Sequence, residues 1–151
     1  MRLCAALTLG IALSATLPSA AHADTGEKAP VPACSTHKAP LKVEEENKSW
    51  YSPNGQVALT LTDDNSLVLK GPDGKEVFST TRQADSNQNG YAELTPQGEL
   101  TTYYYDAVVG GLVRVWHSES GHAMYKDAAL QICDDSTMRI VSGPNLLWSA
   151  P

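Results

Sequence analysis

Positive charge is scarce in this sequence. Its 151 residues contain 11 Lys and Arg against 17 Asp and Glu, a formal net charge of −6 with His neutral. Proteins that bind nucleic acids or anionic membrane surfaces need clustered Lys and Arg to displace counterions. The composition therefore argues against a nucleic-acid partner and against electrostatic attachment to a membrane. The length is that of one small domain.

The sequence has one long apolar run, at its N-terminus. Residues 1–23 combine an early cation at Arg2, an apolar stretch and small residues ending in Ala-His-Ala. This is the three-part pattern of a secretory signal peptide with an A-x-A cleavage site, and its apolar core is too short for a spanning helix. We expect a secreted protein, extracellular or periplasmic, without a membrane span.

Cysteine is rare, and two cysteines remain after the expected cleavage, Cys34 and Cys133. Two cysteines in a secreted domain most often pair, and this bridge would close nearly the whole mature chain into a loop. The alternative is a pair of free thiols in metal or redox chemistry, for which the sequence offers no CxxC motif. We expect the disulfide.

The mature chain divides by composition into two parts. Residues 24–41 contain three prolines and no apolar period, which predicts an extended leader attached at Cys34. Residues 42–151 alternate short runs of Val, Leu, Ile, Thr and Tyr with Gly, Pro, Asn and Asp, the pattern of short strands and turns. The best helical pattern, residues 122–130, is only two turns long. The sequence predicts an all-β domain over residues 42–151.

One pattern occurs three times in this domain. Each copy has an apolar alternation, a polar turn and a second alternation, which predicts a β-hairpin. The copies are residues 59–70, 92–103 and 130–141, and the aromatic residues that follow them are Phe78, Trp116 and Trp148. We expect three small antiparallel sheets around a pseudo-threefold axis, with these three rings directed to the shared centre.

The first unit resembles a known family. Residues 51–81, YSPNGQVALTLTDDNSLVLKGPDGKEVFSTT, resemble the recurrent opening of the bulb-type lectin domain, in which a Ser-x-Asn-Gly turn precedes a strand, a hairpin and a W-S-S/T strand. The later units repeat it more loosely, so the resemblance covers about residues 42–151. It implies the β-prism II fold of the monocot mannose-binding lectins and recognition of mannose-type glycans.

That family binds sugars through the strand motif Q-x-D-x-N-x-V-x-Y. Alternate residues of a strand lie on one face, so five such side chains form a row of hydrogen-bonding groups with one apolar position. Such a row suits a hexose, whose hydroxyls bond to Asp, Asn, Gln and Tyr while Val packs on the C–H face of the ring. A shallow site of this kind binds weakly, and repeated sites add avidity.

No unit keeps the whole motif. The first unit has Thr62, Asp64, Ser66, Val68 and Lys70 at the five positions, the second Thr95, Gln97, Glu99, Thr101 and Tyr103, and the third Cys133, Asp135, Thr137, Arg139 and Val141. Each missing hydrogen bond weakens binding by roughly 0.5 to 3 kcal/mol. The resemblance therefore implies degenerate sugar sites. The first unit is the best candidate, followed by Gln97, Glu99 and Tyr103 of the second unit.

Catalytic and metal-binding patterns are missing from the sequence. His37, His117 and His122 have no H-E-x-x-H or G-x-S-x-G frame around them. The acidic residues 44–46 and 134–135 lack the D-x-D-x-D-G pattern of a calcium loop. We expect neither an enzyme nor a bound cofactor or metal.

A second function fits the same fold, a secreted protein-interaction or inhibitor module that has lost sugar binding. Trp50 or the run Tyr103-Tyr104-Tyr105 would anchor a protein partner if exposed, although packing of the leader also explains Trp50. An open strand face in the first unit would indicate a lectin, whereas a contiguous exposed apolar patch would indicate the interaction module. We expect a monomer in which residues 41–47 can supply an additional strand.

Overall fold

The computed structural model describes residues 30–44, 48–80 and 90–151. The chain divides after Pro30, and the second unit, Val31–Pro151, holds all of the described strands. Its regular structure is β-strand throughout, which confirms the all-β prediction, and residues 122–127 form turns and loops rather than a helix. In these described ranges no helix is long and apolar enough to cross a membrane. The predicted signal peptide lies outside the described residues.

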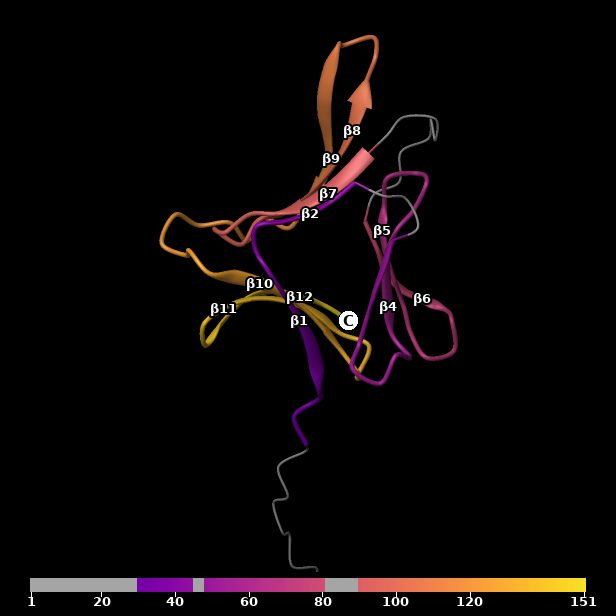
Figure 1. Ribbon diagram of the computed structural model, residues 1–151, viewed down its shortest axis with the longest axis vertical. Coiled ribbons are helices and arrows are strands. Elements are labelled where there is room, and N and C mark those ends of the chain that lie inside the picture. The colour runs from indigo at the N-terminus through magenta and orange to yellow at the C-terminus, as the bar shows by residue number, and fades with distance from the viewer. Residues whose placement is uncertain (1–29, 45–47, 81–89) are drawn as a thin grey trace, which may run out of the picture. The chain divides into compact units, whose positions relative to one another are not determined.

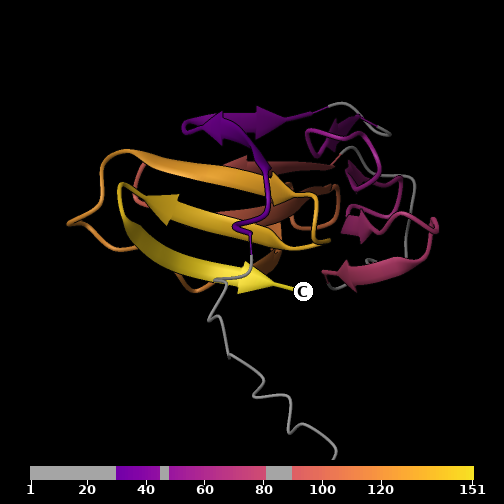
Figure 2. The same ribbon diagram turned by 90° about the horizontal axis from the view of Figure 1, so that it is seen from below.

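The described strands form three antiparallel sheets of four strands each, arranged around a common centre in Figure 1. The first sheet contains β3 (Ser49–Tyr51), β4 (Ala58–Leu61), β5 (Leu67–Lys70) and β6 (Glu76–Ser79). The second contains β2 (Leu41–Val43), β7 (Gly90–Leu94), β8 (Leu100–Asp106) and β9 (Gly111–His117). The third contains β1 (Cys34–Lys38), β10 (Ala128–Cys133), β11 (Met138–Ser142) and β12 (Asn145–Ala150), whose orange and yellow strands lie side by side in Figure 2.

The predicted threefold repeat is confirmed in the hydrogen bonds of the turns. Each hairpin turn is closed by an N–H that donates to the carbonyl three residues earlier, from Asn65, Gly98 and Ser136 at 2.9, 2.9 and 3.1 Å. These three residues have positive φ angles of 59°, 89° and 66°. A β-bulge then interrupts the pairing of β5 with β6, β8 with β9 and β11 with β12 at the same relative place.

The N-terminal part of this unit completes every sheet. Strands β1, β2 and β3 pair with β10, β7 and β4 respectively. The expectation of an extended leader over residues 24–41 is wrong for Cys34–Lys38, which pair with β10 over their whole length. The sequence did not predict this strand because its partner, β10, is distant in the chain and such pairing leaves no local pattern. The additional strand expected in residues 41–47 is present at Leu41–Val43, and residues 45–47 lie outside the described part.

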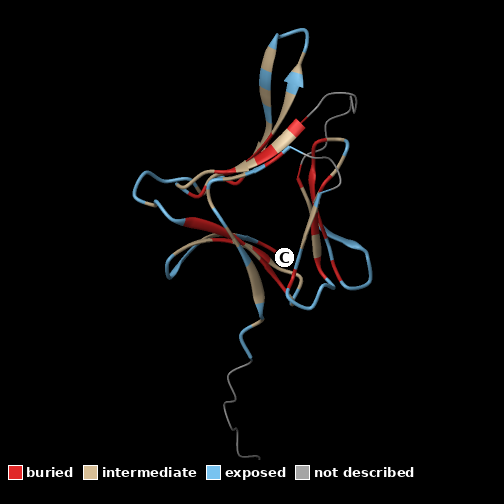
Figure 3. Ribbon diagram, viewed as in Figure 1, coloured by how far each residue is buried: buried red, intermediate tan, exposed pale blue. Residues whose placement is uncertain are grey.

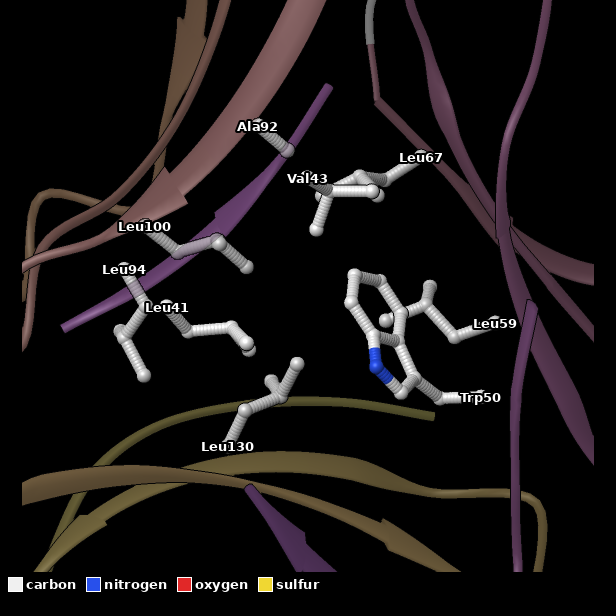
Figure 4. Close-up of a pocket in the computed structure, with 9 residues that line it drawn as sticks. All are labelled: Leu41, Val43, Trp50, Leu59, Leu67, Ala92, Leu94, Leu100 and Leu130. Atoms are coloured by element: carbon white, nitrogen blue, oxygen red, sulfur yellow. The ribbon is translucent and has the colours of Figure 1, made fainter. Parts of the chain in front are cut away.

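Apolar side chains from all three sheets fill the centre. Leu59, Leu94 and Leu130, one from each sheet, are at most 1% exposed. Figure 3 shows the burial along each sheet, and Figure 4 shows these side chains converging with the indole ring of Trp50. Trp50 therefore packs inside, as the leader-packing interpretation required, and burial of such side chains stabilises the fold by roughly 1.5 to 3 kcal/mol each.

The three repeated aromatic residues contact one another. The ring centroids of Phe78 and Trp116 are 6.1 Å apart, those of Phe78 and Trp148 5.6 Å, and those of Trp116 and Trp148 5.7 Å. All three pairs meet edge to face, the arrangement that the ring quadrupoles favour. The predicted shared aromatic centre is confirmed.

The predicted disulfide is also confirmed. Cys34 and Cys133 lie directly opposite each other at one end of the β1–β10 pair, and their sulfur atoms are bonded. The bridge joins residues 99 positions apart. It therefore holds the first described strand against the third sheet.

We predict that removing the bridge destabilises the fold without changing its topology. The double variant Cys34→Ser, Cys133→Ser should lose about 4 to 5 kcal/mol of unfolding free energy, because a loop of about a hundred residues regains its entropy in the unfolded chain. Denaturant unfolding measures this loss, and the reduced wild-type protein should behave like the variant. A change below about 1 kcal/mol would show that pairing of β1 with β10 suffices.

A second prediction concerns acid stability. Burial lowers the pKa of His37, whose ring centroid lies 5.8 Å from that of Trp50. Unfolding restores the ordinary pKa of 6.5, so the unfolded chain takes up the proton first as the pH falls. His37 should therefore reduce stability progressively below pH 6.5, until the folded protein is also protonated. The unfolding temperature of His37→Gln should fall less between neutral and acidic pH than that of the wild type. An equal fall in the two proteins would contradict this prediction.

Candidate functional site

The three rows derived from the sugar motif occupy equivalent places in the three sheets. In each unit the tight turn begins at the first position of the motif and contains the second. The bulge falls immediately before the fifth position, at Lys70, Tyr103 and Val141. Differences between the rows therefore reflect their side chains.

In the first row the polar side chains bond to one another and the apolar side chain is buried. The hydroxyls of Thr62 and Ser66 both donate to Oδ1 of Asp64, the second at 2.5 Å, so these three side chains satisfy one another. Ser66 is 0% exposed and Val68 is 3% exposed, whereas Lys70 is exposed. The apolar position that would pack on a sugar ring is thus covered, and the open strand face expected of a lectin is not formed here.

The third row is also bonded within its own hairpin. Oδ1 of Asp135 accepts hydrogen bonds from the backbone N–H of Thr137 at 3.1 Å and from its hydroxyl at 2.6 Å. Oδ2 accepts from Nη2 of Arg139 at 3.1 Å. Cys133 is fully buried in the disulfide. This row holds its turn together and offers few groups to a ligand.

In the second row the carboxylate is held by a neighbouring loop. Oε1 of Glu99 lies 2.8 Å from Nδ1 of His117, and Oε2 accepts the N–H of Gly121 at 2.7 Å. A Cβ at Gly121 would lie 2.8 Å from Cβ of Glu99, so this close approach requires glycine. Thr101 is 3% exposed, Gln97 is exposed and Tyr103 is half-buried. Thr101 is thus the one buried member of this row.

Tyr103 belongs to a larger surface on the outer side of the second sheet. Tyr91 lies opposite it in the β7–β8 pair, and the two rings stack with centroids 4.9 Å apart and planes inclined by 26°. Nζ of Lys42 lies 4.2 Å from the centre of the Tyr91 ring. Arg114 is exposed and lies opposite Tyr103 in the β8–β9 pair. Directly paired residues share one face of a sheet, so one cross-strand group results.

We call this surface the tyrosine face and define it by five residues, Lys42, Tyr91, Glu93, Tyr103 and Arg114. Glu93 belongs to it because it lies two residues after Tyr91 in the same strand and pairs with Lys42. The face spans all four strands of the second sheet. It combines two aromatic rings with two cations and one carboxylate.

The local charges fix the protonation of this face. Burial, followed by the negative charge of Glu93, raises the pKa of Tyr91 above its ordinary value. A hydrogen bond to Glu44 is the main reason that the pKa of Lys42 is also raised. At neutral pH the Tyr91 phenol therefore keeps its proton and Lys42 its charge. Both side chains can donate hydrogen bonds, and Glu93 can accept them.

Such a face can bind a pyranose ring. Aromatic side chains present an apolar body with a polar tip, while neighbouring charged groups bond to hydroxyls. Sequence reasoning identified Tyr103 but missed the other four members. Tyr91 and Glu93 could have been found from the hairpin, since its turn fixes their pairing with residues 103 and 101. Lys42 could not, because β2 joins the sheet from a distant part of the chain.

The residues that the structure describes contain no candidate metal site. No three His, Cys, Asp or Glu side chains there are grouped so that they could hold an ion. The Glu99–His117 pair of this sheet serves to fix the loop at Gly121, whose N–H donates to the same carboxylate.

Comparison with solved structures identifies the architecture. A monomeric monocot mannose-binding lectin from Gastrodia elata matches with a TM-score of 0.59 at 18% identity, over 76% of this chain and 94% of that chain. A mannose-specific lectin from Dutch crocus, Crocus vernus, matches with a TM-score of 0.57 at 16% identity, over 71% and 88%. The Japanese Marasmius oreades lectin matches with a TM-score of 0.54 at 17% identity, over 80% and 91%.

Sequence comparison alone finds no relative. No protein-family model matches the chain, and no curated protein matches it significantly. The likeness therefore lies in the three sheets and their order rather than in shared side chains. The chain has the β-prism II fold of the bulb-type lectins.

Proposed function

We propose that this chain is a secreted, non-enzymatic lectin-like protein that binds mannose-type glycans through degenerate sites. The lectin fold supports carbohydrate recognition, since the Gastrodia and crocus proteins are mannose-binding and mannose-specific lectins. The signal-like residues 1–23 and the disulfide between Cys34 and Cys133 support secretion. The protein acts as a monomer and needs no cofactor.

The tyrosine face is the main sugar contact in this proposal. The observation that carries it is the stack of Tyr91 on Tyr103, half-buried and bordered by charged side chains of both signs. The carboxylates of Asp64, Glu99 and Asp135 are by contrast bonded within their own sheets. A ligand at those rows would have to compete with these bonds. On the tyrosine face the rings are half-buried and Arg114 is exposed, while Lys42 is paired with Glu44.

The other predicted sugar contacts keep a subsidiary role. Lys70, at the fifth position of the first row, and Gln97, at the second position of the second row, are exposed and can donate to a hydroxyl. Thr62 and Asp64 are partly exposed at the first turn. These positions extend the contact to a longer glycan, and each adds little because a shallow solvated hydrogen bond contributes about 1 kcal/mol.

A second candidate function is favoured by one observation. The β8–β9 hairpin exposes Tyr105, Val108, Val109 and Leu112, at 49%, 96%, 72% and 55%. A contiguous exposed apolar patch near the tyrosine run is what a protein-interaction or inhibitor module requires. This module is the alternative if sugars do not bind.

The first test is glycan binding by the oxidised protein and its Tyr103→Ala variant. Removing the ring destroys the stack with Tyr91, so binding to mannose-type glycans should weaken at least tenfold, about 1.4 kcal/mol. Tyr51→Ala is the matched control, because Tyr51 is an exposed tyrosine of the first sheet. A glycan array followed by calorimetry measures the effect. Equal binding by Tyr103→Ala and wild type would remove the tyrosine face from the proposal.

A further variant separates the first row from the tyrosine face. Asp64→Asn keeps the shape of the side chain but removes the charge that accepts from Ser66. On our proposal it should change glycan affinity less than threefold, about 0.6 kcal/mol. Loss of binding in Asp64→Asn but not in Tyr103→Ala would place the site on the first hairpin. If the wild type binds no glycan at high concentration, the interaction module is the better description.

A further inference from the structure

The β8–β9 hairpin continues beyond the described part of the sheet that carries it. Among the residues that the structure describes, β7 pairs with β8 as far as Gly90 and Tyr104, whereas β8 and β9 remain paired as far as Asp106 and Gly111. Figure 1 shows this orange hairpin standing out past its neighbours β2 and β7. Residues 105–112 thus form a two-stranded tip, which we call the hairpin tip.

Both faces of the hairpin are apolar or aromatic. Tyr105 lies opposite Leu112 on one face, and Tyr104 lies opposite Val113 on the other. Val108, at 96% exposed, and Val109, at 72%, occupy the turn. The sequence has no charged side chain between Asp106 and Arg114. A protein groove covers one apolar face of a ligand, whereas lipid surrounds an inserted segment on all sides. Tyr104 and Val113 are half-buried, but the turn at residues 107–110 is exposed throughout and carries no charged side chain, so the turn matches the second case.

The backbone of the turn is already hydrogen-bonded. Oδ1 of Asp106 accepts the N–H groups of Val108 at 2.7 Å and Val109 at 3.1 Å. The carbonyl of the same residue accepts the N–H of Gly110 at 2.8 Å. An unpaired N–H strongly opposes transfer from water into hydrocarbon. These bonds remove that obstacle for three successive N–H donors of the turn.

Charged groups limit how deeply the hairpin tip can enter a lipid bilayer. Hydrogen bonds from Val109 and Val108 lower the pKa of Asp106, so its carboxylate stays ionised at neutral pH. A charged carboxylate is unfavourable in hydrocarbon, which stops entry near this residue. Arg114 is exposed two residues beyond Leu112, at a level where a guanidinium can reach lipid phosphate. Tyr105 lies between the apolar turn and Arg114, the place that tyrosine favours at a membrane interface.

We propose that the hairpin tip inserts into the outer part of a zwitterionic lipid bilayer and attaches the protein peripherally to membranes. Insertion is driven by burial of Val108 and Val109, with Tyr105 and Leu112, which lie opposite each other, at the headgroup level. Attraction to anionic lipid does not drive it, because the net charge of the chain is negative. The interaction does not require a glycan, since the lipids involved carry no sugar.

Sedimentation with sugar-free phosphatidylcholine vesicles tests this proposal. The full chain should sediment at millimolar lipid, and Val108→Asp should bind at least tenfold more weakly. Leu146→Asp is the matched control, because Leu146 is 60% exposed on β12 of the third sheet. Adding anionic phosphatidylserine should not strengthen binding. Absence of wild-type sedimentation, or an equal loss in both variants, would overturn the proposal, as would binding that requires anionic lipid.

A second measurement locates the inserted residue. In Val108→Trp the new indole should be quenched by lipids brominated near the headgroup end of the acyl chain, and its emission should move to shorter wavelength on binding. A Leu146→Trp variant should show neither change. Quenching that is equal in the two variants would mean that the protein adsorbs without inserting the hairpin tip. In that case a protein partner would be the better explanation of the exposed valines.

Discussion

The fold depends on the pairing of one N-terminal stretch with all three sheets. Strands β1, β2 and β3 join β10, β7 and β4, so each three-stranded repeat gains a fourth strand from the same chain. A repeat on its own has one apolar face and nothing to cover it. Three repeats closed around Leu59, Leu94 and Leu130 bury that face, and the N-terminal stretch ties them together. The disulfide at Cys34 secures its beginning.

The same threefold arrangement explains why the sheets differ in what they offer to a ligand. The turns and bulges repeat, but the acid of each row makes different bonds, to hydroxyls at Asp64, to a histidine and a glycine at Glu99 and to an arginine at Asp135. These bonds stabilise each sheet locally without a ligand. In our proposal the outward-facing aromatic groups of the second sheet therefore carry recognition.

The second sheet is also the one whose hairpin is lengthened. Its strands β8 and β9 have seven residues each, against four in β5 and β6 of the first sheet. The lower part of this hairpin carries Tyr103 and Arg114, and its upper part carries the exposed valines. In our proposals polar recognition and apolar contact therefore share one hairpin. A glycan on the tyrosine face and a membrane at the hairpin tip would contact adjacent parts of this hairpin.

The sequence by itself determined the local features. Alternation and turn residues predicted the three hairpins, the repeated aromatic residues predicted their shared centre, and the cysteine count predicted the bridge. These features are encoded within a few residues or by composition. Tertiary structure alone decided that Cys34–Lys38 form a strand, that Val68 is covered and that Lys42 reaches Tyr91. Each of these depends on which distant strand lies alongside, and strand pairing across the chain is selected by burial of the whole core rather than by any local pattern.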